Sequence, residues 1–124
     1  MKIHEFDPVI YPRKLWIVVT NNPQVIKDNF EYDSDPENFF GGGHAAMVIS
    51  CSQKETNLIG VCICFTKHKH LTTKNIAHES VHAASYMFSA CNMSMGFEDG
   101  KDEHYAYLVG WIAECCEKVK LNKK

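Results

Sequence analysis

The stretch that decides the fold runs from residue 58 to residue 91, LIGVCICFTKHKHLTTKNIAHESVHAASYMFSAC. Its first part, residues 58–66, is rich in β-branched and apolar side chains and predicts a buried strand. After a short basic segment the period changes, and Thr72 or Thr73 can cap a helix that we expect to run to about Cys91. Apolar residues recur in this helix at spacings of three and four, which predicts one buried face. That face consists of Ala77, Val81, Ala84, Phe88 and Cys91.

The remaining elements follow from the same patterns. They are a strand over residues 14–20, a short helix over 23–30 with Asn22 as its cap, a strand over 44–52 and a last helix over 102–119. The last helix has its own apolar face, formed by Tyr105, Leu108, Ile112, Cys116 and Val119. Between the short helix and the strand over 44–52, residues 33–43 predict a glycine-rich loop. We therefore expect one α+β domain spanning residues 1–124, with a short antiparallel or mixed β-sheet of three or four strands packed against the two long helices.

Composition excludes several classes of protein. The chain has 124 residues, 45% hydrophobic and 23% charged, with thirteen Lys plus Arg against fifteen Asp plus Glu. The net charge of -2 argues against a broad basic surface, so we expect no nucleic-acid partner as the primary one. No apolar run approaches the roughly 20 residues that cross a bilayer, and the N-terminus does not resemble a secretory signal. We expect no membrane partner and a cytoplasmic location.

Six cysteines raise the question of disulfides or a thiolate zinc site. Cys62 and Cys64 lie on one face of an expected strand, and Cys115 and Cys116 are adjacent in an expected helix. No CxxC pair occurs in the sequence. We interpret these cysteines as small buried apolar side chains in a reducing compartment.

The chemistry of the chain is concentrated in the motif HESVH, residues 78–82, which matches HExxH. At about 100° per residue, His78 and His82 project from one face of a helix one turn apart, so both imidazoles can bind one metal ion. Glu79 lies on the next face, where it can act as a general base on a metal-bound water. The alternative is a pair of ordinary surface histidines on an amphipathic helix.

A catalytic zinc site usually has a third protein ligand. Glu103 is our candidate because it opens the last helix and shares a helix face with Tyr107, Gly110 and Glu114. That face lies opposite the apolar one and could look toward the histidines, with Gly110 allowing close packing against the HExxH helix. An N-terminal acid favoured by the helix dipole would explain Glu103 equally well. Substitutes for Glu103 are Glu98, Asp99, Asp102 and His104.

Together, residues 78–82 and the segment EHYAYLVGW, residues 103–111, resemble the gluzincin class of zinc metallopeptidases, in particular minimal single-domain phage and bacterial members. The resemblance implies Zn²⁺ as the cofactor, His78, His82 and Glu103 as its ligands, and Glu79 as the base that activates water. It also implies a peptide or protein substrate, bound as an extended chain at a sheet edge. Tyr107 is the preferred stabiliser of the oxyanion, ahead of Tyr86, His104 and Tyr105.

Two other functions remain open at this stage. The chain could be a non-catalytic, zinc-stabilised structural or interaction module, possibly of phage origin, because it offers no second lobe to form the far wall of a cleft. The same metal site could also hydrolyse an amide that is not a peptide. The sequence indicates neither the cleavage specificity nor the oligomeric state.

Overall fold

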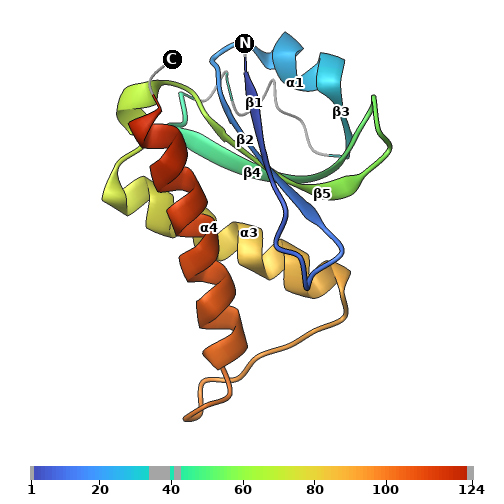
Figure 1. Cartoon of the computed structure of the whole chain (residues 1–124). Helices are drawn as coiled ribbons and strands as arrows, with labels where there is room; N and C mark the ends of the chain where they lie inside the picture. The colour runs from blue at the N-terminus through green and yellow to red at the C-terminus, as the bar shows by residue number, and fades with distance from the viewer. Residues whose placement is uncertain (1, 34–39, 41–42, 123–124) are drawn as a thin grey trace.

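The computed structural model describes residues 2–33, 40 and 43–122 and has a five-stranded mixed sheet with helices on both faces (Figure 1). The strands are β1 (Ile3–Phe6), β2 (Lys14–Val19), β3 (Phe30–Tyr32), β4 (Ala46–Gln53) and β5 (Ile59–Phe65). The helices are α1 (Pro23–Asn29), the 3-10 turn η1 (His68–His70), α3 (Thr73–Ala90) and α4 (Glu103–Leu121). The α+β class is confirmed, but the sheet has five strands rather than three or four.

The sheet has the strand order β1-β2-β5-β4-β3. Among the described strand pairs, β2 and the central strand β5 are parallel and the others are antiparallel; β4 and β5 form a hairpin, with Ala46 opposite Phe65 and Ser52 opposite Ile59. The two strands that sequence reasoning missed, β1 and β3, are four and three residues long and lie at the edges. Strands this short carry too little alternation to stand out in the sequence.

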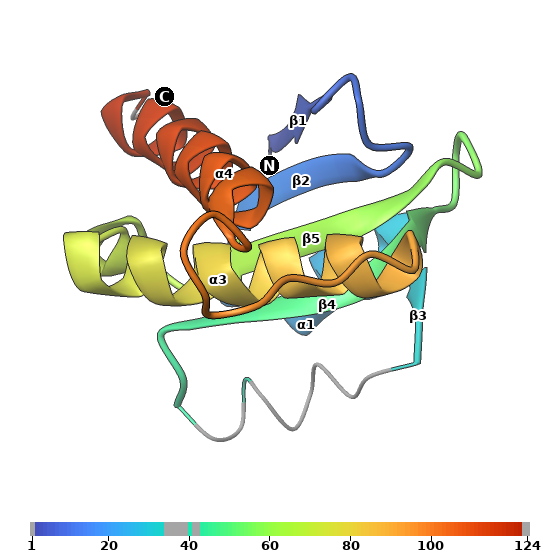
Figure 2. The same ribbon diagram turned by 90° about the horizontal axis from the view of Figure 1, so that it is seen from below.

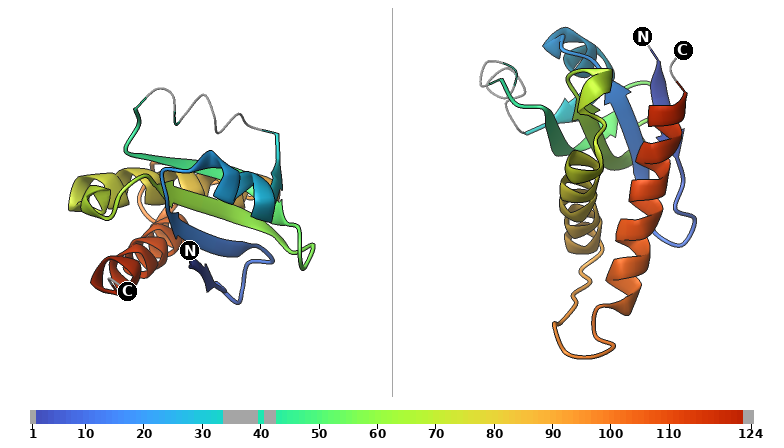
Figure 3. Two further views of the ribbon diagram at one scale, coloured as in Figure 1. Left: turned by 90° about the horizontal axis from the view of Figure 1, so that it is seen from above. Right: turned by 90° about the vertical axis from the view of Figure 1, so that its left-hand side faces the viewer.

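Helices cover both faces of this sheet, α3 and α4 on one side and α1 on the other (Figures 2 and 3). Strand β5 serves both layers: Val61 and Ile63 face α3 and α4, whereas Cys62 and Cys64 face α1. A strand buried on both faces reads as a continuous apolar run, as residues 58–66 do. The cysteines behave as predicted, because five of the six free thiols are buried.

The helix boundaries follow the capping signals in the sequence. The side chain of Asn22 accepts a hydrogen bond from the Gln24 amide at the start of α1, and Pro23 occupies its first turn. Thr72 caps α3 in the same way by accepting from the Asn75 amide. Because these caps are local, the sequence predicts them well.

The buried face of α3 differs from the expected one. Val81, expected in the core, is 44% exposed, and Ala77 is also exposed. The buried apolar residues are Ile76, Ala83, Ala84, Met87 and Phe88. The predicted stripe was wrong in part: Ala84 and Phe88 are buried as expected, but α3 packs against two layers at once, the sheet and α4, and its buried face lies about 60° from the predicted one. The stripe of α4 is confirmed: Leu108, Ile112, Cys116 and Val119 are buried and Tyr105 is half-buried.

The glycine-rich loop expected over residues 33–43 falls mostly outside the described residues, at positions 34–39 and 41–42. Phe40 packs against the cluster on the α1 side of the sheet. Within the described ranges, none of the helices has the length and apolar character required to span a bilayer.

Candidate metal centre

His78 and His82 converge on one point on the exposed face of α3. Their Nε2 atoms lie 3.2 Å apart, and the two rings meet edge to face with centroids 4.8 Å apart. Two nitrogens that bind one tetrahedral zinc at about 2.0–2.1 Å would be separated by about 3.3 Å. The 3.2 Å contact is a hydrogen bond between the two rings, and its length is also close to the spacing of two adjacent ligands of a single metal ion. The side chain of His78 is 64% exposed, so a metal there would be open to solvent.

Glu79 lies next to this pair but is buried, with only 8% of the residue exposed. Its Oε2 atom is 4.0 Å from His78 Nε2. Burial raises the pKa of the Glu79 carboxyl, and the neighbouring His78 and His82 act in the opposite direction. The carboxyl is thus held beside the two ring nitrogens in a partly desolvated position, as expected for a proton acceptor that is not itself a ligand.

The first turn of α4 is attached to the HExxH helix by Tyr105. The Tyr105 hydroxyl donates to the Val81 carbonyl oxygen at 2.9 Å and lies 2.8 Å from Ser85 Oγ. Its ring also packs edge to face on Phe88, with centroids 5.2 Å apart. Because Val81 belongs to the HExxH motif, α4 is fixed directly to the helix turn that carries His82.

The opposite face of α4, which carries Glu103, is open to solvent. Tyr107 is 74% exposed, and a Cβ atom added at Gly110 would meet no atom within 4 Å. The prediction that Gly110 permits close packing against α3 was wrong, because the apolar Tyr105 face provides that contact instead. Glu103 is the first residue of α4 and is exposed. The face of α4 that packs on α3 carries Tyr105, not Glu103.

The described part of the chain contains no group of three His, Cys, Asp or Glu side chains that could hold a metal ion. Glu103 therefore stays a prediction as the third ligand. Among its substitutes, His104 stacks on the Phe88 ring at 5.1 Å between centroids, and its Nε2 lies 3.3 Å from the Ser94 carbonyl oxygen. His104 thus packs against Phe88 of α3.

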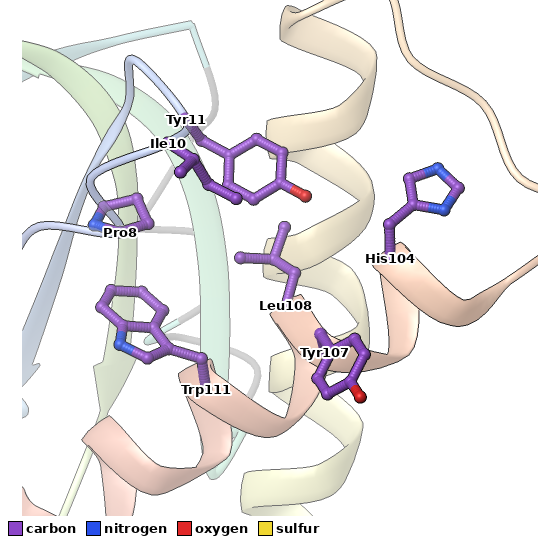
Figure 4. Close-up of a pocket in the computed structure, with 7 residues that line it drawn as sticks. All are labelled: Pro8, Ile10, Tyr11, His104, Tyr107, Leu108 and Trp111. Carbon is purple, nitrogen blue, oxygen red and sulfur yellow. The ribbon is translucent and has the colours of Figure 1, made fainter.

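Tyr107 lines a cavity of about 340 Å³ between α4 and the loop that joins β1 to β2 (Figure 4). The other lining residues are Pro8, Ile10, Tyr11, His104, Leu108 and Trp111. Among the described residues, no hydrogen bond, ion pair or ring contact joins Tyr107 to His78 or His82. The role of Tyr107 at the oxyanion remains a prediction that this arrangement does not support.

One feature of the site was not evident from the sequence: part of the outer edge of β4 pairs with none of the described strands, and we call this part the open edge. Strand β3 pairs with β4 only at Cys51, Ser52 and Gln53. Residues 46–50 pair with β5 on one side and with no described strand on the other. Helix α3 packs against β4, so this free edge lies alongside the helix that carries the HExxH motif. This part of β4 stays unpaired because β3 is only three residues long, and the sequence did not predict so short a strand.

Comparison with known proteins adds no relative: no protein-family model, curated protein or solved structure matches the chain. Its function is therefore inferred from its own residues.

Proposed function

We propose that the chain is a zinc-dependent metallopeptidase whose centre is built on His78, His82 and Glu79. The observation that carries this proposal is the 3.2 Å separation of the two Nε2 atoms on an exposed helix face. The buried carboxyl of Glu79 beside them supports it. Imidazole nitrogens are ordinary zinc ligands, and the spacing fits two corners of a tetrahedral site.

The roles of the residues follow from their positions. His78 and His82 would hold zinc through Nε2, and Glu103 is the proposed third ligand. When bound, zinc polarises a substrate carbonyl and makes water acidic enough to lose a proton near neutral pH. Glu79 would accept that proton on its carboxylate and deliver it to the leaving amine.

The open edge of β4 supports an extended peptide as the substrate. Residues 46–50 can offer backbone donors and acceptors to a peptide that adds as a further strand. Such pairing recognises the main chain and depends little on substrate side chains. A peptide held there would run alongside α3, the helix that carries both histidines.

Metal analysis and hydrolysis test the proposal in two steps. Purified without a histidine tag, the protein should carry about one zinc per chain, and His78→Ala should abolish this binding. His70→Ala is the matched control, because His70 lies in η1 outside the site. Unchanged zinc content in His78→Ala would refute the site.

The second step separates an enzyme from a zinc-stabilised structural or interaction module. Glu79→Gln should retain zinc and abolish cleavage of a broad peptide library, because the amide cannot accept a proton. A wild-type protein that binds zinc and cleaves nothing would favour the module.

The third ligand has its own test. Glu103→Gln should weaken zinc binding by more than about tenfold, since even outer-shell changes cost about 10–100-fold. Glu114→Gln is the control, because Glu114 is also exposed on α4. Equal zinc affinity in the two variants would require another third donor.

A further inference from the structure

The overall charge of -2 conceals a strong separation of charge along the chain. Residues 67–74 and 118–124 contain seven lysines, two histidines and no acidic residue. The rest of the chain has only six Lys and Arg residues, together with all fifteen Asp and Glu residues. Such an asymmetry indicates a polyanionic partner more directly than net charge does.

The tertiary structure brings residues 67–74 and the described part of the second segment, residues 118–122, together. The end of α4 lies beside η1 and the start of α3, although the segments are about 50 residues apart in sequence (Figure 1). His68 Nε2 donates to the Lys120 carbonyl oxygen at 2.8 Å. We call this surface the basic end. Its described lysines and histidines are Lys67, His68, Lys69, His70, Lys74, Lys118 and Lys120.

A cavity of about 510 Å³ lies in the seam between the two segments. Lys69 and His68 line it from one segment and Lys120 from the other, together with the hydroxyl-bearing Thr72 and Thr73. Cationic and hydroxyl groups that converge on one depression offer donors to an anion.

The described lysines of the basic end, Lys67, Lys69, Lys74, Lys118 and Lys120, form no ion pair with an acidic residue of the described part of the chain. Clustered, unpaired lysines repel one another, and an external polyanion would relieve that repulsion. The nearest acid in sequence, Glu117, is exposed and precedes Lys118.

The chemistry of the surface favours phosphates of a duplex over other polyanions. The cavity is lined by no Phe, Tyr or Trp side chain on which single-stranded bases could stack, and its imidazole, His68, is hydrogen-bonded to the Lys120 carbonyl oxygen. Among the described residues that line the cavity, Leu121 is the one exposed large hydrophobic residue, and this is too little apolar surface for insertion into a membrane. Lysines act as point charges and suit the closely spaced phosphates of double-stranded nucleic acid.

We propose that the basic end binds the phosphate backbone of double-stranded nucleic acid without sequence preference. This departs from the expectation based on net charge, because a count over the whole chain averages the basic end with an acidic remainder. The surface is independent of the zinc site, so either proposal can fail without the other.

Fluorescence anisotropy with a labelled 20-base-pair DNA duplex of arbitrary sequence tests the proposal. If about four phosphates are neutralised, the slope of log K against log salt is about -3.6, and affinity falls about 100-fold between 50 and 200 mM NaCl. The double variant Lys69→Glu, Lys120→Glu should weaken binding at 50 mM at least tenfold.

The matched control is Lys54→Glu, Lys101→Glu, which changes the net charge equally at two exposed lysines outside the basic end. It should bind within about threefold of wild type, and circular dichroism should show that all variants are folded. His78→Ala should bind the duplex normally, which separates this surface from the zinc site.

Several results would overturn the proposal. Absence of duplex binding at 50 mM NaCl would do so, as would equal losses in the two double variants. Equal affinity for poly-glutamate would show a general response to negative charge. Binding to phosphatidylserine vesicles with none to the duplex would identify a membrane surface instead.

Discussion

Ser80, in the middle of the HESVH motif, makes a sharp prediction about stability. It is fully buried, and its Oγ forms no hydrogen bond with any residue that the structure describes. It lies near the Cys116 thiol of α4, whose pKa is raised to about 12 by burial, an effect that Ser80 opposes. Sulfur is a weak acceptor and compensates little of the desolvation of a hydroxyl. We therefore expect Ser80→Ala to stabilise the protein.

The expected gain has two sources. A buried hydroxyl without a good partner costs about 1–3 kcal/mol, and replacing Ser by Ala within a helix adds up to about 0.5 kcal/mol. Some of this is offset by the small void and by the weak thiol contact, so we expect a net gain of about 1–2 kcal/mol. For a chain of this length, that raises Tm by about 3–8 °C.

Urea unfolding measures the effect as an increase in the midpoint at constant m-value. Ser85→Ala is the matched control, because Ser85 lies in the same helix but is exposed and bonded to the Tyr105 hydroxyl. It has the same gain in helix propensity and loses a hydrogen bond, so its stability should change little or fall. A destabilised Ser80→Ala protein, or equal effects of the two changes, would refute the reasoning.

Further changes probe the sheet, the helices and the thiols. Gly60→Ala should prevent stable folding or cost more than about 3 kcal/mol in thermal unfolding, because its Cβ would overlap the Lys14 backbone in the β2–β5 pair. Gly110→Ala should stabilise the protein by about 1 kcal/mol, because its Cβ would meet no atom within 4 Å and alanine favours the helix. Native protein should react with a thiol reagent at pH 8 through Cys91 only, since burial raises the pKa of the other five thiols; rapid reaction of a second thiol would contradict this. Tyr105→Phe should cost about 1 kcal/mol in urea unfolding by removing the hydroxyl's bonds to the Val81 carbonyl and to Ser85 Oγ, and an unchanged midpoint would show that these bonds add no stability.

Much of the fold could be predicted because its signals are local. Asn22 and Thr72 mark helix starts by capping backbone amides two or three residues away, and both caps are present. The hairpin of β4 and β5 follows from two apolar runs joined by a short polar connection. Strands β1 and β3 were missed because they are only four and three residues long, too short for an alternating pattern to stand out.

The sequence by itself determined the paired histidines. Helical geometry places His78 and His82 one turn apart whatever surrounds them, and their Nε2 atoms meet at 3.2 Å. Glu79 is likewise placed beside them by its position in the motif.

Three features depend on contacts between distant parts of the chain. The Tyr105 face of α4 meets α3, and Glu103, the first residue of that helix, is exposed. Lysines about 50 residues apart in sequence form one basic end. Each helix is oriented about its axis so that its apolar face is buried, and this fixes the direction of all its other side chains. A polar residue is therefore positioned by the apolar residues on the opposite side of its helix, and their partners lie far away along the chain.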